Sequence, residues 1–221
     1  MKIKSILAIG ILSAILSIVF TGCATTSMMD KKVSSKKARI IFNVSSEIDI
    51  EKVKTGLYDA VSLRVSDLNE NENLLPEELP QKPLSPKQSK MFSQLAAMGA
   101  GNPSFEMMQL DMSNAYYSVS GQASMASGFN TKAEYYKAAV YPYQDGYKVY
   151  LYLFYQEGTD GIMGALTKKI ADSIVGKEGS LLYMAQVRDE FIKSLPKATI
   201  MSQSPRKLEK VVLNDIGLAK N

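Results

Sequence analysis

The sequence predicts an α+β domain, in which an antiparallel sheet of about four to five strands carries helices packed on one face. Three observations support this class. A β-branched and aromatic run stands at Arg39–Val44, a long alternating segment surrounds Asp145-Gly146, and apolar residues recur at helical spacing before and after that segment. The expected order of elements is β-α-insertion-β-β-β-α-α.

The first strand and the first helix follow from the residue pattern. Arg39–Val44 is typical of a strand. Ser46 lies three residues before Asp49, which is a capping-box-like start for a helix. Helical apolar spacing then predicts a helix over residues 48–64, with this stripe: Ile50, Val53, Leu57 and Val61.

Residues 66–112 interrupt the pattern as a Pro- and Met-rich insertion. A long irregular segment inside a compact domain is usually either functional or disordered. Ser85 and Pro86 provide an N-cap and a first-turn proline, so we expect one short helix over residues 85–99. Three methionines suit adaptable partner contacts as well as ordinary packing: Met107, Met108 and Met112.

The central sheet is expected from a strand at 115–122 and a hairpin over 132–156. We predict that Asp145-Gly146 forms the two-residue turn, which places Tyr141 opposite Tyr150. Alternation assigns one face to the core: Tyr136, Ala138, Val140, Val149, Leu151, Leu153 and Tyr155. The other face carries aromatic rings and lysines: Tyr135, Lys137, Ala139, Tyr141, Tyr143, Lys148, Tyr150, Tyr152 and Phe154.

Helices dominate the remainder of the chain. Apolar residues at every fourth position predict a helix over 161–175, and Ser180 caps a second helix that runs to Leu195. A short strand at 198–201 and a final helix from Ser204 complete the pattern. Helices covering one face of an antiparallel sheet would form a two-layer, helix-grip-like sandwich, an analogy of fold that carries no function.

The N-terminus has the layout of a secretory signal peptide. A basic head at Met1–Lys4 precedes the uncharged run Ser5–Phe20 and a small-residue exit at Thr21-Gly22. A membrane-spanning helix needs roughly 20 apolar residues, so this uncharged run is too short. We therefore expect residues 1–22 to be removed.

The residues around the single cysteine indicate an anchor. Phe20-Thr-Gly-Cys23 resembles the lipobox of bacterial lipoproteins, although that family usually has Leu where Phe20 stands. The resemblance implies cleavage between Gly22 and Cys23, a diacylglyceryl group on the cysteine sulfur, and a third acyl chain on the freed amine. It also implies the outer membrane, facing the periplasm, because Ala24 replaces the Asp that retains such proteins at the inner membrane.

A tether and one domain complete the organisation. Residues 23–38 form the lipidated N-terminus and a small, polar, lysine-containing tether with an r.m.s. reach of about 20 Å. Its lysines would either touch anionic head groups or remain solvated. Residues 39–221 form a single periplasmic domain.

The composition excludes several kinds of chemistry. The chain has no histidine, which removes Ser-His-Asp and Cys-His catalysis and most zinc or copper sites. The formal charge of +4 counts Lys2 and Lys4, so the chain from Cys23 onward carries about +2, too little for a nucleic-acid-binding face. We predict no metal and no cofactor. Carboxylate chemistry, a Ser-Lys pair or no catalysis remain.

The aromatic face of the hairpin is the main candidate surface for a partner, because tyrosine offers rigid contact area with a polar tip. The alternatives are that a helix covers it, or that tyrosine is simply a favoured strand residue on a half-exposed face. The candidate partner-binding residues are Tyr135, Tyr141, Tyr143, Tyr150, Tyr152, Phe154, Met107, Met108 and Met112.

The sequence leaves three functional hypotheses. The first is a non-catalytic outer-membrane lipoprotein that binds or scaffolds an envelope protein. The second is a peptidoglycan- or glycan-acting enzyme that uses carboxylates near the sheet: Glu134, Glu157, Asp160 and Asp172. The third is a lipid- or lipopolysaccharide-handling module, which needs an apolar cavity between sheet and helices.

Overall fold

A six-stranded antiparallel sheet is the centre of the computed structural model, which describes residues 33–90, 92, 102–127, 130–158, 179–206 and 208. The strand order is β2-β5-β6-β7-β1-β8. The strands are β1 (Val33–Ser45), β2 (Asn69–Glu72), β5 (Tyr117–Ser127), β6 (Asn130–Tyr143), β7 (Gly146–Gly158) and β8 (Thr199–Ser204). The α+β class with an antiparallel sheet is confirmed.

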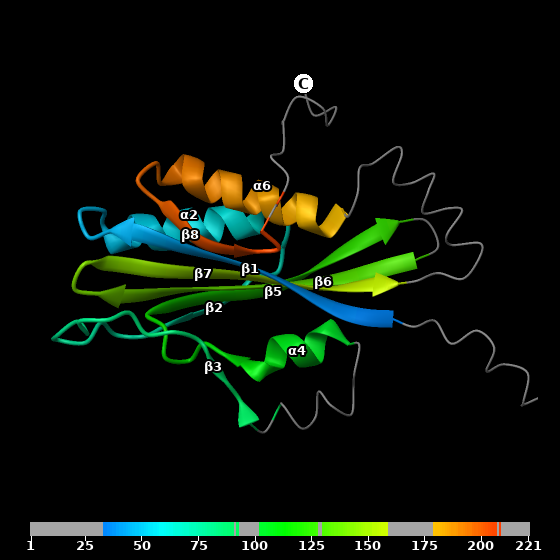
Figure 1. Ribbon diagram of the computed structural model, residues 1–221, viewed down its shortest axis with the longest axis horizontal. Helices are drawn as coiled ribbons and strands as arrows, with labels where there is room; N and C mark the ends of the chain where they lie inside the picture. The colour runs from blue at the N-terminus through cyan, green and yellow to red at the C-terminus, as the bar shows by residue number, and fades with distance from the viewer. Residues whose placement is uncertain are drawn as a thin grey trace, which may run out of the picture.

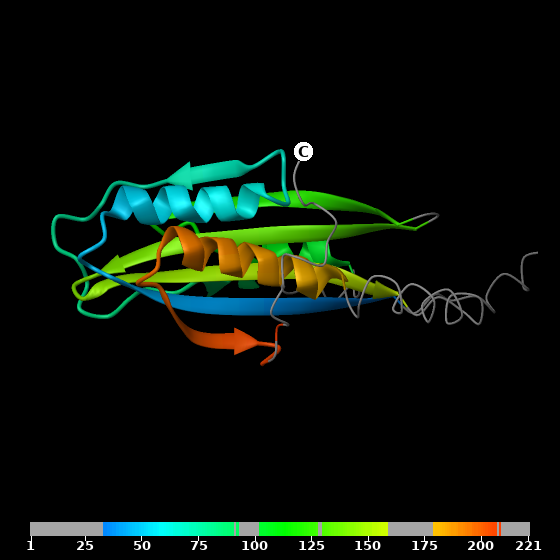
Figure 2. The same cartoon turned by 90° about the horizontal axis from the view of Figure 1, so that it is seen from above.

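Both faces of the sheet carry further elements (Figure 1). The helices α2 (Ile50–Ser62) and α6 (Gly179–Ser194) lie together on one face, and Figure 2 shows them side by side above the strands. On the opposite face lie the short helix α4 (Pro103–Gln109) and a two-stranded sheet of β3 (Lys87–Gln88) and β4 (Leu110–Asp111). The insertion therefore forms a layer that the sequence did not predict.

The main core lies between the sheet and the helices α2 and α6. The hairpin residues assigned to the core face are in it, and all of them are fully buried except Tyr155, which packs against its margin. Phe42 of β1 meets Phe191 of α6 with ring centroids 4.8 Å apart. Because each fully buried large apolar side chain stabilises the fold by about 1.5–3 kcal/mol, this interface dominates the stability.

The two long helices agree closely with the pattern that predicts them. The helix expected over 48–64 spans Ile50–Ser62, and the helix expected from Ser180 to Leu195 spans Gly179–Ser194. The cap of the first differs from the prediction. The side chain of Asp49, and not that of Ser46, accepts the backbone N–H of Glu51 at 2.8 Å.

The first strand begins six residues before the predicted position. β1 starts at Val33 and pairs with β7 along its whole length, from Val33 opposite Gly158 to Ser45 opposite Gly146. The prediction assigned residues 33–38 to the tether because they are polar. Their backbone groups nevertheless pair with the long strand β7, and such backbone pairing does not depend on apolar side chains.

The sixth strand, β2, was missed because it contains no apolar residue. Its sequence is Asn-Glu-Asn-Glu, and all four residues are exposed. Polar contacts hold it in place. The hydroxyl of Tyr117 donates to Glu70 at 2.6 Å, and the ammonium of Lys54 donates to Glu72 at 2.6 Å. The predicted count of four to five strands was therefore too low.

The hairpin register differs from the prediction by two residues. Tyr143 pairs with Gly146, so Gln144 and Asp145 form the loop, and Tyr141 lies opposite Lys148 instead of Tyr150. Gly146 belongs to β7, where its φ is +143° and an added Cβ would overlap the carbonyl oxygen of Val44 on β1. The glycine is required both by this positive φ and by the close approach of the neighbouring strand. Because the shift is even, every side chain keeps its predicted face.

Several other predicted elements fall partly or wholly outside the described residues. The helix expected over 85–99 is contradicted at its start, because Lys87–Gln88 form β3 and pair with β4. Residues 90 and 92 are helical, and residues 93–101 lie outside the described part of the chain. The helix expected over 161–175 also lies outside it. The final helix was expected from Ser204, but that residue ends β8.

Candidate partner-binding surface

The aromatic residues of the hairpin form a continuous row on the face opposite the main core. Alternate positions along β7 stack: Tyr150 and Tyr152 have ring centroids 6.4 Å apart, and Tyr152 and Phe154 have centroids 6.1 Å apart. Tyr141 of β6 meets Tyr150 edge-on at 5.4 Å. The spacing reflects the strand repeat, since residues two apart on one strand lie about 6.6–6.8 Å apart on the same face.

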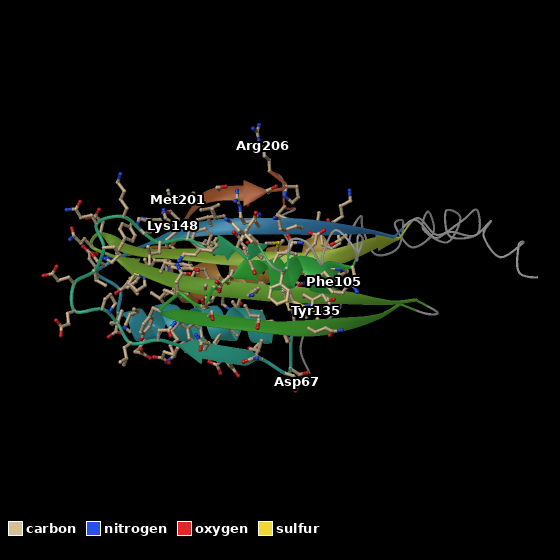
Figure 3. The ribbon with its side chains drawn as sticks, turned by 90° about the horizontal axis from the view of Figure 1, so that it is seen from below. Asp67, Phe105, Tyr135, Lys148, Met201 and Arg206 are labelled. Carbon is tan, nitrogen blue, oxygen red and sulfur yellow. The ribbon has the colours of Figure 1, made fainter. Side chains whose placement is uncertain are left out.

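The insertion covers most of this row. Leu110 and Met112, which come directly after α4, form a second buried cluster with Ala115, Ala139 and three rings of the hairpin face, and Met107, Tyr135 and Tyr150 pack against it. Figure 3 views this face with α4 in front of the sheet. The buried aromatic residues are Tyr141, Tyr152 and Phe154, joined by Tyr143 with its hydroxyl donating to Asn43 at 2.7 Å.

Burial changes the role of the candidate residues. Five of the nine have at most 9% of their surface accessible, because they already pack against the chain's own side chains: Tyr141, Tyr143, Tyr152, Phe154 and Met112. Tyr135, Tyr150 and Met107 are half-buried. Only Met108 is exposed, with 46% of its surface accessible. The alternative that the chain itself covers the aromatic face is therefore the one the geometry favours.

A half-buried lysine fastens this cover to the sheet. The ammonium of Lys137 on β6 donates to the backbone carbonyl of Leu110 on β4. Burial lowers the pKa of Lys137, and the nearby carboxylate of Asp111 opposes that shift. The N–H of Ser113 donates to Asp111 at 2.9 Å, which holds the pKa of that carboxyl below its ordinary value. These contacts serve the attachment of β4.

The carboxylates of the enzymatic hypothesis are not gathered in the described residues. Glu134 lies on the core face of β6, fully buried, where the hydroxyl of Tyr136 donates to it at 3.3 Å. Burial and the charge of Glu134 raise the pKa of Tyr136 well above its ordinary value. The Glu157 side chain, Asp160 and Asp172 lie outside the described part of the chain. Glu134 is thus part of the core in this structure.

A lipid-handling module would need an apolar cavity between the sheet and the helices, and in the described residues side chains fill this space. The side chains of the main cluster between α2, α6 and the sheet are buried against one another. Among the residues that the structure describes, no three side chains of His, Cys, Asp or Glu are grouped so that they could hold a metal ion. None of the helices described here is both long and apolar enough to cross a bilayer.

Three of the large apolar side chains that are exposed in the described residues lie in the first half of the insertion, in a segment that we call the arm (residues 73–86). Leu74 is 95% accessible, and Leu75 and Leu84 are about half accessible. Prediction from sequence missed these leucines, because they lack helix or strand periodicity. The sequence feature that could have found them is their position among prolines, because prolines interrupt regular structure without removing the apolar side chains beside them.

The arm is fixed at several points. The side-chain amide of Asn73 donates to the carbonyls of Ser113 and Ala115, at 2.9 and 2.6 Å. The backbone N–H of Gln144 donates to the carbonyl of Pro80 at 3.0 Å. β3 then pairs with β4 immediately after the arm. The backbone that displays the leucines is consequently held at its start, its middle and its end.

The arm also has a three-residue period. Pro80, Pro83 and Pro86 are half-buried, whereas the residues between them are exposed. A period of three is that of a polyproline II helix, whose residues i, i+3 and i+6 share one edge. The prolines thus face the body of the molecule and Leu84 faces outward.

No family model, curated protein or solved structure matches this chain. The candidate surface therefore rests on the geometry given above.

Proposed function

We propose that this chain is an outer-membrane lipoprotein, anchored through Cys23 and facing the periplasm, whose domain binds or scaffolds an envelope protein without catalysis. The observation that carries the binding part is the arm, because it displays three accessible leucines on a fixed backbone. Exposed apolar side chains grouped on one segment are typical of protein interaction sites. A fixed backbone lowers the conformational entropy lost on binding.

The anchor and the domain are close along the chain. Val33, where β1 begins, follows Cys23 by ten positions. Covalent geometry allows ten positions to span at most about 33–36 Å, so the start of β1 would lie within that distance of the membrane surface. The helices α2 and α6 on one face support a helix-grip-like core for this domain. A partner would then be a protein that reaches the same narrow layer of the periplasm.

The arm is tested by removing its apolar side chains without disturbing its attachment. A chain with Leu74→Ser, Leu75→Ser and Leu84→Ser should recover at least tenfold less of its partner after cross-linking in cells and affinity purification. Each buried leucine contributes about 1.5–3 kcal/mol, and about 1.4 kcal/mol corresponds to tenfold. The matched control is Leu63→Ser, because Leu63 is 54% accessible, comparable to Leu75 and Leu84, but lies at the end of α2.

Deletion of the whole insertion would be a poor test. It would remove β2 from the sheet and strip Leu110 and Met112 from the aromatic cluster. If the triple variant recovers the same partners as the wild type in the same yield, the arm is not the binding surface.

The anchor has a separate test. Cys23→Ala should abolish incorporation of labelled palmitate and leave the precursor uncleaved. A Cys23→Ala chain that is still cleaved and membrane-bound would contradict the lipobox interpretation and leave the arm hypothesis untouched.

A further inference from the structure

The two edges of the central sheet differ in their chemistry. β2 closes one edge with only four residues, two of which are glutamates. β8 forms the other edge with six residues, Thr-Ile-Met-Ser-Gln-Ser, none of them charged. An edge strand presents unpaired backbone groups, and proteins protect such edges by short length, by charge on the strand or by a β-bulge. In the part of the chain that the structure describes, β8 is neither short nor charged, and its one protective feature is the bulge at Met201.

β8 also exposes apolar side chains at this edge. Ile200 is 41% accessible and Met201 is 58% accessible. The pairing of β8 with β1 shifts between Ile41 and Phe42, so that Met201 is an extra residue bulging from the ladder. Its sulfur contacts the ammonium of Lys148 on β7. An added strand would cover both apolar side chains while pairing with the free backbone groups.

Two cations flank β8 without a carboxylate partner among the described residues. Lys148 contacts the Met201 sulfur, and Arg206 lies just beyond the end of the strand. Figure 3 shows Lys148, Met201 and Arg206 along this margin of the sheet. By contrast, the nearby Lys197 is already paired with Glu47 at 2.6 Å. The edge therefore has a local positive charge that a neighbouring strand could compensate.

The positive charge at this edge indicates which kind of partner could pair with β8. A second copy pairing β8 with β8 would bring the cations of both copies to one junction, and like charges across an interface are unfavourable. A lipid surface would satisfy the charge but could not supply the backbone groups of a strand. We propose that β8 accepts an extended acidic segment of another protein as an added strand. This surface is separate from the arm, and the proposal does not depend on it.

The proposal is tested with synthetic peptides of nine residues that alternate valine with glutamate or valine with lysine. The mature, acylated chain in detergent is mixed with each peptide, and amide hydrogen exchange is measured along the chain. The glutamate peptide should protect amides of β8, which reports new backbone hydrogen bonds and not only charge attraction. The lysine peptide should bind roughly tenfold more weakly, since two exposed ion pairs at up to about 1 kcal/mol each become repulsive.

Variants locate the effect. Arg206→Glu and Met201→Lys, both at exposed positions, should reduce the protection of β8, whereas Asn71→Lys on the opposite edge should not. The triple leucine variant of the arm should bind the glutamate peptide normally. Absence of protection at millimolar peptide, equal protection by both peptides, or protection at β2 instead of β8 would each overturn the proposal. Unchanged partner recovery by the triple leucine variant, together with intact protection of β8 by the glutamate peptide, would contradict only the proposed function of the arm.

Discussion

Met112 provides a quantitative test of how the aromatic face is covered. Its side chain is 2% exposed and belongs to the cluster that Leu110 and the hairpin rings complete. Replacing a buried methionine by alanine costs about 2–5 kcal/mol, from lost transfer free energy and from the cavity that remains. Since α4 and β4 form a short, one-sided cover that can settle into part of the cavity, we expect about 2–3 kcal/mol for Met112→Ala.

Met108 is the matched control because it is the same residue type in the same segment, but 46% exposed. Met108→Ala should change the free energy of unfolding by no more than about 0.5 kcal/mol. Urea denaturation monitored by circular dichroism gives both values, and hydrogen exchange over residues 103–115 shows whether the cover opens before the sheet unfolds. If Met112→Ala costs no more than Met108→Ala, Met112 does not close the aromatic face.

Two further predictions concern the hairpin and the edge strand β2. Gly146→Ala should lower the melting temperature, because a φ of +143° costs a residue with a Cβ about 1–3 kcal/mol. The overlap of that Cβ with the carbonyl oxygen of Val44 adds to this cost. An unchanged melting temperature would refute this interpretation of Gly146. The hydrogen bonds from Lys54 and Tyr116 hold the pKa of Glu72 below its ordinary value, so their stabilisation is present near neutral pH and is lost as the pH falls through that lowered pKa. Exchange protection of β2 should therefore decrease more on acidification in the wild type than in Lys54→Met, which keeps only the hydrogen bond from Tyr116, and the same decrease in both chains would argue against this network.

The side-chain pattern predicted the faces of the hairpin better than its pairing. Alternation depends only on whether positions are odd or even, so the core face from Tyr136 to Val140 survived a register error of two residues. The position of Gly146 beside the turn depends on a contact that is remote in sequence, because an added Cβ there would overlap the carbonyl oxygen of Val44. No local signal distinguishes that requirement from a glycine needed in the loop.

The edge strand β2 shows a different limit of prediction. Its four residues carry no strand signal, and its stability comes from Lys54, Tyr116 and Tyr117, which lie far from it in the sequence. The aromatic face shows a third limit. Tyrosine suits a covered face as well as a half-exposed one, so the hairpin alone could not indicate that Leu110 and Met112 would close it.

The apolar residues are buried in the second half of the insertion and exposed in the first half, and this difference favours the arm as a binding surface. The second half uses its apolar residues internally, where Leu110 and Met112 complete the aromatic cluster. The first half leaves Leu74 exposed although Asn73, the residue before it, is tied to the carbonyls of Ser113 and Ala115. A leucine held in water on a fixed backbone gains nothing for the fold, whereas a partner that buries it gains about 1.5–3 kcal/mol at little cost in backbone entropy. The same contacts that hold the insertion on the sheet thus also fix the backbone that displays Leu74.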